Sequence, residues 1–317
     1  MTTALTVGIE SKAALVVGNN PFSKAIVADW IAFCDVKPAT QATYNKAIEN
    51  FAAYLMNNNI STPTRQDVIG YRDNLLALDY KVSSVRLYMT ICKKFFRWLS
   101  SKMIYPNVAE GVKLPAMPND EHARDSLTLS EAKATISSFK GTSEKELRDR
   151  AIMSLMIGCG LRSIEIVRLD VGDIEKRRGQ WFIRVYGKAR AGKTDSVPLS
   201  QSLKKILDDY LQSRAVVRKR EPMFISTSRR NRGARLETQS VSRLAKRVFK
   251  TIGIESERIT CHSCRHTAAT LMLQAGVAIR QVQRILRHRS ACTTEIYSHD
   301  LDAFNNKGVE ILSNLLF

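Results

Sequence analysis

Apolar and polar residues alternate along this chain with the period of amphipathic helices. Between residues 21 and 104, four stretches place apolar side chains every three to four positions, and short polar segments separate them. The second stretch shows the repeat most clearly, at Tyr44, Ala47, Ile48, Phe51 and Leu55. Such a repeat buries one face of a helix. We therefore expect residues 21–104 to form a bundle of four helices.

Polar residues in front of the apolar stretches predict where helices begin. Thr64 precedes the third stretch, and Ser83 or Ser84 stands at the start of the fourth. Ser130 precedes a helical stretch further along the chain. Hydroxyl side chains accept hydrogen bonds from the first free amides of a helix, so we expect caps at these positions.

A change in composition divides the chain. Residues 105–125 contain three prolines, and proline removes a backbone donor and disfavours helix at the preceding residue. We expect a linker there, between a first domain of residues 21–104 and a second of residues 126–302. Residues 1–20 are then a leader, and residues 303–317 an apolar tail helix.

One region of the second domain shows the alternation of β-strands. Residues 181–186 alternate, residues 196–199 form a second candidate strand, and a turn rich in Gly, Lys and Arg joins them. Helical stretches precede and follow this hairpin. The expected fold is mainly α with a small β-hairpin or sheet, in the α+β class.

The charge balance indicates a polyanionic partner. Lysine and arginine total 49 against 30 acidic residues, and this formal charge of +19 is spread along the chain. Such an excess favours nucleic acid as the partner. The candidate DNA-binding residues lie on predicted helices and on an arginine-rich loop that we expect to be mobile. They are Lys93, Lys94, Arg97, Arg229, Arg230, Arg243 and Arg247.

Nothing in the sequence predicts a membrane segment or export. No apolar run reaches the roughly 18–20 residues that span a bilayer, and Glu10 and Lys12 interrupt the apolar N-terminal stretch. Scattered cysteines in apolar contexts are typical of reduced, buried thiols. We expect a cytoplasmic protein associated with the nucleoid.

The densest group of reactive side chains lies between residues 261 and 300. This stretch holds His262, Arg265, His288 and Tyr297. Cleaving a phosphodiester without a metal requires a nucleophile, donors to the non-bridging oxygens and an acid for the leaving oxygen. The planar fork of arginine suits those oxygens. Because no acidic cluster is available to hold magnesium, we expect no metal and no other cofactor.

Cys261 and Cys264 form a C-x-x-C pair, for which zinc binding is the alternative interpretation. A structural zinc site needs a second pair of ligands. Cys292 and His266 are the nearest candidates, and both lie in stretches that we assign to helices. We therefore expect no zinc site there.

Four motifs in this order resemble those of the tyrosine recombinase, or phage integrase, family. GCGLRSIEIVRLDVGDI at residues 158–174 resembles the family's first arginine box, and VYGKARAGKTDSVPLS at residues 185–200 resembles its lysine hairpin. HSCRHTAATLML at residues 262–273 is similar to its H-x-x-R box, and LRHRSACTTEIYSH at residues 286–299 to the final box. The helical first domain resembles the family's core-binding domain, and the second its catalytic domain.

The resemblance implies a role for each reactive position. Arg162 and Arg265 are expected to bind the scissile phosphate. His262 is expected to donate to that phosphate and to assist proton movement, and His288 to contact the same phosphate. A lysine of the hairpin would protonate the leaving 5′ oxygen. Tyr297 would attack and form a 3′-phosphotyrosine link.

Two positions depart from the family pattern. The hairpin is about two residues longer than usual, so Lys188 and Lys193 both compete for the role of the acid. We favour Lys188, because the end of a strand is held more rigidly than the far side of the turn. Arg287 stands where the family usually has glycine. If that position requires a positive φ, arginine is strained there.

The expected function is site-specific DNA recombination through a Holliday junction, without metal or ATP. The resemblance implies a homo-tetramer on two DNA duplexes, with the tail docked on a neighbouring protomer and accessory proteins as further candidate partners. The short segment before Pro21 resembles two-domain, Xer-like enzymes, and integration, excision and dimer resolution all stay open. The alternatives are a type IB topoisomerase-like relaxing enzyme and a DNA-binding regulator without catalysis.

Overall fold

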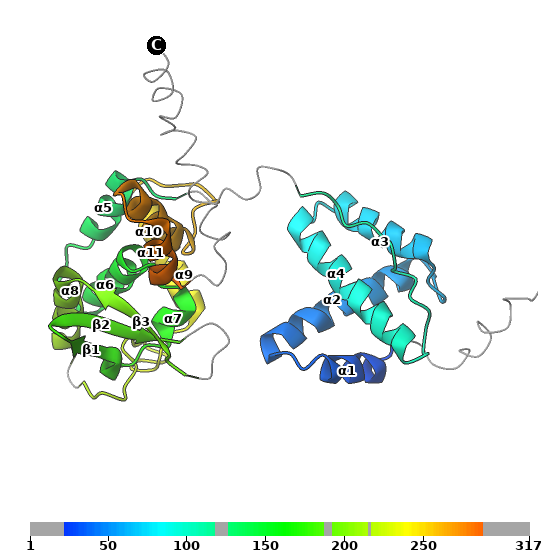
Figure 1. The fold of residues 1–317 in the computed structure, drawn as a ribbon, viewed down its shortest axis with the longest axis horizontal. Coiled ribbons are helices and arrows are strands. Elements are labelled where there is room, and N and C mark those ends of the chain that lie inside the picture. The colour runs from blue at the N-terminus through cyan, green and yellow to red at the C-terminus, as the bar shows by residue number, and fades with distance from the viewer. Residues whose placement is uncertain (1–21, 118–125, 187–191, 215–216, 288–317) are drawn as a thin grey trace, which may run out of the picture. The chain divides into compact units, whose positions relative to one another are not determined.

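The computed structural model describes residues 22–117, 126–186, 192–214 and 217–287. The chain divides into two compact units, one ending at Glu121 and the other starting at His122 (Figure 1). The described part of the first unit is helical, and that of the second combines helices with a small antiparallel sheet. The expected α+β class is confirmed.

The described part of the first unit contains four helices. They are α1 (Lys24–Phe33), α2 (Pro38–Asn57), α3 (Arg65–Ala77) and α4 (Val82–Ser101). Their apolar faces meet in a core rich in aromatic rings, in which Trp30 stacks on Tyr44 with the centroids 5.1 Å apart. The helices therefore follow the predicted periodicity and bury the faces that it marked.

The caps agree with the prediction only in part. Thr64 precedes α3 as expected, and its amide and hydroxyl both donate to Asp67 at 2.7 Å. The prediction for α4 was wrong, because the helix already begins at Val82, and Ser83 and Ser84 lie inside its first turn.

The predicted cap at Ser130 was also wrong. Helix α5 (Leu129–Ser137) begins after Thr128, which lies two residues before the predicted cap. The Thr128 hydroxyl accepts from the amide of Glu131 at 3.2 Å, and the Glu131 carboxylate accepts from the amide of Thr128 at 2.7 Å. This reciprocal capping box requires an acidic residue three positions after the cap. Thr128 has that partner.

Residues 105–115, which we call the strap, belong to the first unit and pack against its helices. Ala109 and Val112 are buried. Lys93 of α4 donates to the carbonyl of Val112 at 2.8 Å, and Arg86 of α4 donates to that of Pro115 at 2.5 Å. We expected a linker over residues 105–125, but its first part is fixed to the helices. Prolines exclude a helix here without preventing tertiary packing.

The second unit carries the remaining described elements. They are α5, α6 (Glu144–Gly158), α7 (Ser163–Val167), the 3-10 helix η2 (Val171–Asp173), β1 (Ile174–Arg177), β2 (Gln180–Val185), β3 (Asp195–Leu199), α8 (Gln201–Gln212), α9 (Thr238–Thr251), α10 (Ser263–Gln274) and α11 (Ile279–Leu286). The strands pair in the order β1-β2-β3, all antiparallel. The predicted hairpin is β2 and β3. The edge strand β1 was missed, because its sequence IEKR has no apolar alternation.

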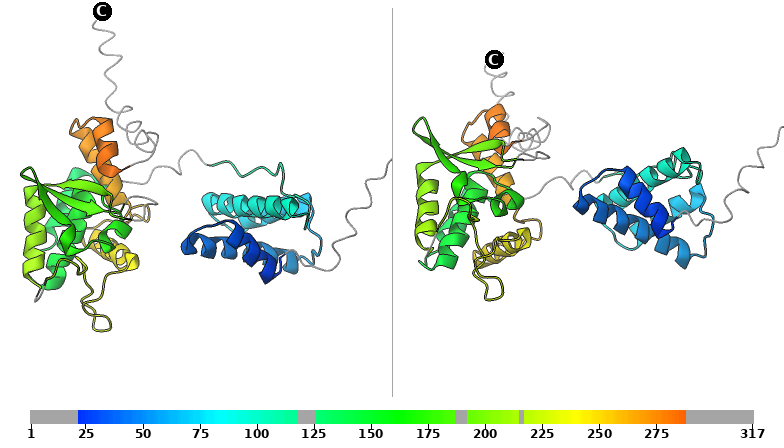
Figure 2. Two further views of the ribbon diagram at one scale, coloured as in Figure 1. Left: turned by 60° about the horizontal axis from the view of Figure 1, so that its bottom comes forward. Right: turned by 90° about the horizontal axis from the view of Figure 1, so that it is seen from below.

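Helix α6 lies at the centre of this unit and is buried along most of its length. The buried face of the sheet supplies Ile183, Val185, Val197 and Leu199 to the same core as α6 and α9. In both views of Figure 2 the sheet and α9 lie on different sides of the unit, with helices of the core between them. This core supports the turn that follows α6.

No helix in the described ranges combines the length and the apolar character needed to cross a membrane.

Candidate active site

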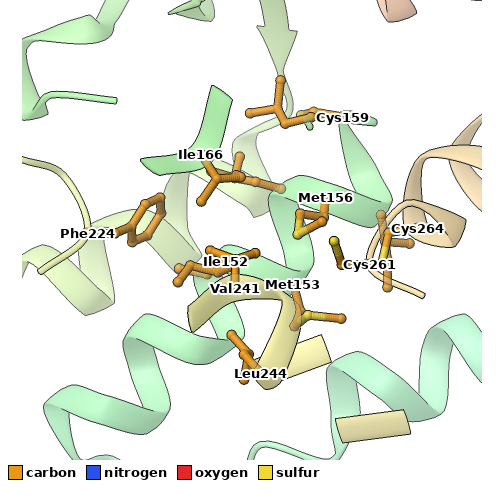
Figure 3. Close-up of a cluster of buried hydrophobic side chains, with 14 of the residues drawn as sticks. Ile152, Met153, Met156, Cys159, Ile166, Phe224, Val241, Leu244, Cys261 and Cys264 are labelled. Atoms are coloured by element: carbon orange, nitrogen blue, oxygen red, sulfur yellow. The ribbon is translucent and has the colours of Figure 1, made fainter. Parts of the chain in front are cut away.

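Three segments that are distant in sequence meet at one end of α6. They are the turn of residues 158–162 after α6, the start of α10, and the end of α11. Helices α10 and α11 pack together through Ala268, Ala269, Val282 and Leu286. Met153 and Met156 of α6 lie near Cys261 and Cys264 in the buried cluster drawn in Figure 3. The first arginine box and the H-x-x-R box therefore pack on the same buried core.

Gly160 allows these segments to approach closely. Its φ is +61°, and a Cβ atom there would lie 2.3 Å from Cδ2 of Leu286. The carbonyl of Gly160 accepts a hydrogen bond from Nη1 of Arg265 at 2.7 Å. Nη2 of Arg265 donates to the carbonyl of Leu286. Arg265, which is 6% exposed, therefore ties the turn to the end of α11.

Arg162, Glu165 and Arg287 form a charged triad beside this tie. Glu165 accepts through Oε1 from Nη1 of Arg162 at 2.9 Å, and through Oε2 from the amide of Arg162 at 2.8 Å. The same Oε2 accepts from Nη2 of Arg287 at 2.6 Å. The side chains of Glu165 and Arg287 are 5% and 8% exposed, and that of Arg162 is 27% exposed. Of the two cations, Arg162 is the more accessible.

Arg287 occupies a left-handed conformation, with φ of 58° and ψ of 44°. The position thus has the positive φ that makes arginine strained where the family usually has glycine. Burial lowers the pKa of the Arg287 guanidinium, and the charge of Arg162 lowers it further, whereas Glu165 opposes the shift. The carboxylate offsets the burial of this cation.

His262 stands directly before α10, and its side chain is exposed. Its Nδ1 lies 3.9 Å from Sγ of Cys261. Cys261 and Cys264 are buried among apolar side chains, and burial raises the pKa of the Cys264 thiol. Within the described ranges, no group of three or more His, Cys, Asp or Glu residues is arranged to hold a metal ion.

Lys193 lies on the far side of the hairpin turn and is bound by two carboxylates. Its Nζ lies 2.6 Å from Oδ2 of Asp170 and also contacts Asp173. Burial by itself lowers the pKa of Lys193, but the hydrogen bonds and charges of the two carboxylates outweigh it, and the pKa is raised. Nη2 of Arg235 donates a hydrogen bond to Oδ1 of Asp170 at 2.5 Å. Lys193 is therefore a cation held within an ion-pair network.

Three predicted catalytic positions, Lys188, His288 and Tyr297, lie outside the described residues. The predicted leader of residues 1–20 and the tail of residues 303–317 lie outside them as well. The roles of these positions stay predictions.

The basic candidates of α4 differ in their surroundings. Lys93 donates a hydrogen bond to the carbonyl of Val112 in the strap. Nζ of Lys94 donates to the hydroxyl of Tyr44 at 3.2 Å and lies 5.7 Å from the centre of that ring. Arg97 is exposed. A phosphate would therefore compete with protein partners at two of these positions.

The basic candidates of the second unit lie on α9 and on the loop before it. Arg243 and Arg247 are exposed on the polar face of α9, and Arg247 pairs with the buried Asp149 of α6 at 2.7 Å. Arg229 and Arg230 are exposed on a loop that we predicted to be mobile. Backbone hydrogen bonds link this loop's ends, from Gly233 to Ser226 and from Ser226 to Ala234. It is a hydrogen-bonded turn.

Sequence patterns missed three residues that shape the site. Asp170 and Asp173 lie near the end of the first arginine box and bind Lys193 of the hairpin, and Arg235 pairs with Asp170. The sequence D-V-G-D offered a weak signal, since carboxylates three positions apart lie close together in a helical turn. Nothing in the sequence connected Arg235 to them.

The chain is similar to known proteins over most of its length. Residues 126–303 match the profile of the phage integrase family. Tyrosine recombinase XerA of Pyrococcus furiosus is 31% identical over 258 residues, which are 80% of this chain and 84% of that protein. Tyrosine recombinase XerC of Pelobacter propionicus is 30% identical over 274 residues, which are 84% of this chain and 86% of that protein.

Solved structures show the same fold. The post-cleavage complex of the XerH site-specific recombinase with a palindromic difH substrate matches with a TM-score of 0.68 at 18% identity, over 92% of this chain and 84% of that one. A lambda integrase (75–356) dimer bound to a COC′ core site matches with a TM-score of 0.65 at 18% identity, over 83% of this chain and 95% of that one.

Proposed function

The chain belongs to the phage integrase family of tyrosine recombinases, and we propose that it cuts and rejoins double-stranded DNA at specific sites through Tyr297. The observation that carries the proposal is that two arginines are anchored at the turn that follows α6. Arg265 binds the carbonyl of Gly160, and Arg162 follows two residues later. The planar fork of arginine suits the non-bridging oxygens of a phosphodiester.

The proposed reaction proceeds in two transesterifications. The phenolic oxygen of Tyr297 attacks the phosphorus, and His262 assists the removal of the phenolic proton. The bond between the phosphorus and the 5′ oxygen then breaks. Arg162, Arg265 and His288 stabilise the charge on the non-bridging oxygens. The product is a 3′-phosphotyrosine and a free 5′ hydroxyl, which attacks in the reverse step. Because the covalent link conserves the bond energy, rejoining needs no ATP.

We propose Lys188 as the acid that protonates the leaving 5′ oxygen. Lys193 is the competitor, but Asp170 and Asp173 bind it and raise its pKa. A general acid works best when its pKa is near the working pH. An ammonium that two carboxylates hold in the charged form gives up its proton less readily, which supports Lys188.

We further propose that four copies assemble on two DNA duplexes and exchange strands through a Holliday junction. The names of the relatives support recombination, and the apolar residues of the tail support docking on a neighbouring copy. A type IB topoisomerase-like enzyme would use the same chemistry without pairing two sites. Exchange between two sites distinguishes these functions.

The test begins by selecting bound sequences from a random DNA pool, because the target site is unknown. A nicked duplex of the selected sequence traps the covalent step, since the short strand past the nick diffuses away after cleavage. We expect a protein–DNA adduct with the wild-type chain, also in the presence of EDTA, and none with Tyr297→Phe. Equal adduct with Tyr297→Phe, or no adduct with either protein, would exclude the proposed reaction.

A second assay separates the alternatives. We expect a plasmid with two selected sites to yield recombined products. Relaxation of supercoils without exchange would identify a topoisomerase-like enzyme, and binding without adduct would identify a regulator.

A further inference from the structure

Arg287 is a buried cation that contacts the charged partner of Arg162. The Glu165 carboxylate accepts three hydrogen bonds, two from Arg162 and one from Arg287. The pair of Glu165 and Arg287 joins residues that are 122 positions apart in sequence. The first turn of α7 and the end of α11 are thus connected by one carboxylate.

Two features of Arg287 are costly for the fold. Its backbone is left-handed, a conformation that disfavours residues with a Cβ, and its side chain is only 8% exposed. Glycine at this position would avoid both the strain and the desolvation of a charge. A contribution outside the backbone turn must therefore favour arginine here.

Holding the two segments together does not by itself account for Arg287. Arg265 already joins the same segments, because it donates to the carbonyls of both Gly160 and Leu286. Leu286 also packs with Ala268 and Ala269 of α10. The distinct contribution of Arg287 is a second cation on Glu165.

This second cation has a geometric and an electrostatic effect on Arg162. Arg287 and the amide of Arg162 both bind Oε2, so the carboxylate is fixed in one orientation, and Oε1 is aimed at Nη1 of Arg162. The triad also carries two positive charges against one negative charge. With glycine at position 287, the carboxylate would neutralise Arg162 alone, and less positive potential would remain for an anion.

We infer that Arg287 is a positioning residue that aligns Arg162 on the scissile phosphate through their shared partner Glu165. The inference rests on the proposed function, because it assumes that Arg162 binds that phosphate. It predicts an effect of Arg287 on the cleavage step that exceeds its effect on DNA binding.

The test compares variants of Arg287 in single-turnover cleavage of the nicked substrate. Arg287→Gly removes the side chain and relieves the backbone, so the variant is not expected to misfold. We expect its cleavage rate to fall roughly 10- to 100-fold, as for a misplaced binding group, with the Kd for DNA changed about 2-fold or less. Arg287→Lys should retain part of the rate, because lysine keeps the charge but loses the fork.

A matched control removes a neighbouring charge. Arg284 lies on the exposed side of the last turn of α11. We expect Arg284→Met to leave the cleavage rate unchanged, whereas Arg287→Met lowers it. Equal losses in both variants would mean that the total positive charge at the end of α11 matters and the contact with Glu165 does not, and would overturn the inference.

Chemical rescue provides a measurement that a purely structural role would not affect. Millimolar guanidinium should restore part of the cleavage by Arg287→Gly, because the ion can occupy the vacated place on Glu165. Urea, which is neutral and of similar shape, should not. A slow variant with a lowered Tm and no rescue would show that Arg287 only supports the fold.

The failures of the two proposals are distinguishable. If the wild-type chain forms the adduct and Arg287→Gly cleaves at the wild-type rate, the inference about Arg287 is wrong and the proposed function stands. If the wild-type chain forms no adduct on its selected site, the proposed function fails, and the inference fails with it.

Discussion

Gly160 carries only a hydrogen atom where other residues have a side chain, and this allows the turn after α6 to pack against the end of α11. The carbonyl of this residue binds Arg265, and its Cα faces Leu286 at the end of α11. The packing of well-ordered interiors leaves little room for an added methyl group. The spacing between the turn and α11 therefore depends on the smallest residue.

We expect Gly160→Ala to destabilise the second unit by about 1–3 kcal/mol, as overpacking of a core does. Thermal unfolding measures the loss. Gly253→Ala is the matched control, because Gly253 also has a positive φ, of +82°, but a Cβ atom added there would meet no other atom within 4 Å. Backbone strain affects both variants, and the clash affects only the first. Equal shifts in Tm would mean that the contact with Leu286 is unimportant.

The two hairpin lysines can be distinguished by the leaving group of the substrate. We expect Lys188→Ala to cleave ordinary DNA slowly and to recover on a substrate with a 5′-bridging sulfur, because a thiolate leaves without a proton. Lys193→Ala should show no such selective recovery, since we assign Lys193 to Asp170 and Asp173. The ratio of cleavage rates on the two substrates is the measurement. Selective recovery by Lys193→Ala instead would assign the acid role to Lys193.

Among the helices, α4 uses its cations for two purposes. Lys93 and Arg86 donate to carbonyls of the strap, whereas Arg97 is exposed. All of these residues are polar positions of the helical repeat. The repeat alone could not show which of them bind the strap and which face solvent. That difference depends on where the strap, which comes later in the chain, packs against α4.

We expect Arg97→Ala to reduce the salt dependence of DNA binding, lowering the magnitude of the slope of log K against log salt by about 1. Lys93→Ala should leave the slope unchanged and lower the stability of the first unit by roughly 1 kcal/mol, through its lost hydrogen bond. Binding titrations at several salt concentrations and thermal unfolding test both. If Lys93→Ala changes the slope and spares the Tm, then Lys93 contacts phosphate.

On the scale of the whole molecule, the residues that the structure describes form two separate large apolar cores. Within the described ranges, one large cluster of buried residues comes from α1–α4 and the strap, and another surrounds α6. No described residue belongs to both clusters. Separate cores permit separate unfolding transitions.

We expect calorimetry to resolve two transitions that respond to different substitutions. Ile48→Val, in the first core, and Ile152→Val, in the second, each remove one buried methyl group and should cost about 0.5–1.5 kcal/mol. Each should lower the midpoint of one transition and leave the other in place. A single transition that both variants shift would show that the units unfold together.

We also expect the tail to affect assembly without affecting recognition. Deleting the residues after Asp302 should abolish the multi-copy complex on paired sites, while binding of one copy to one site persists. Gel-shift analysis and sedimentation on selected DNA measure both properties. An unchanged complex would place the apolar tail residues on their own protomer.

Sequence patterns were sufficient to predict the helices, the hairpin and the motifs that identify the family. These depend on local chemistry, namely a period near 3.6, alternation in strands, and reactive residues at fixed spacings. The patterns were less reliable at helix starts, because Thr128 with Glu131 forms a better capping box than Ser130 does. They also missed β1, whose pairing with β2 rather than its composition makes it a strand.

Which charged groups share a partner became visible only in the folded chain. Glu165 binds Arg162 within its own turn and Arg287 from a distant helix, and Arg265 joins the carbonyls of Gly160 and Leu286. Local periodicity carries no information about such pairs, because loops of any length can separate them. The packing of α10 and α11 against the end of α6 brings them within hydrogen-bond distance, and burial then makes each pairing necessary.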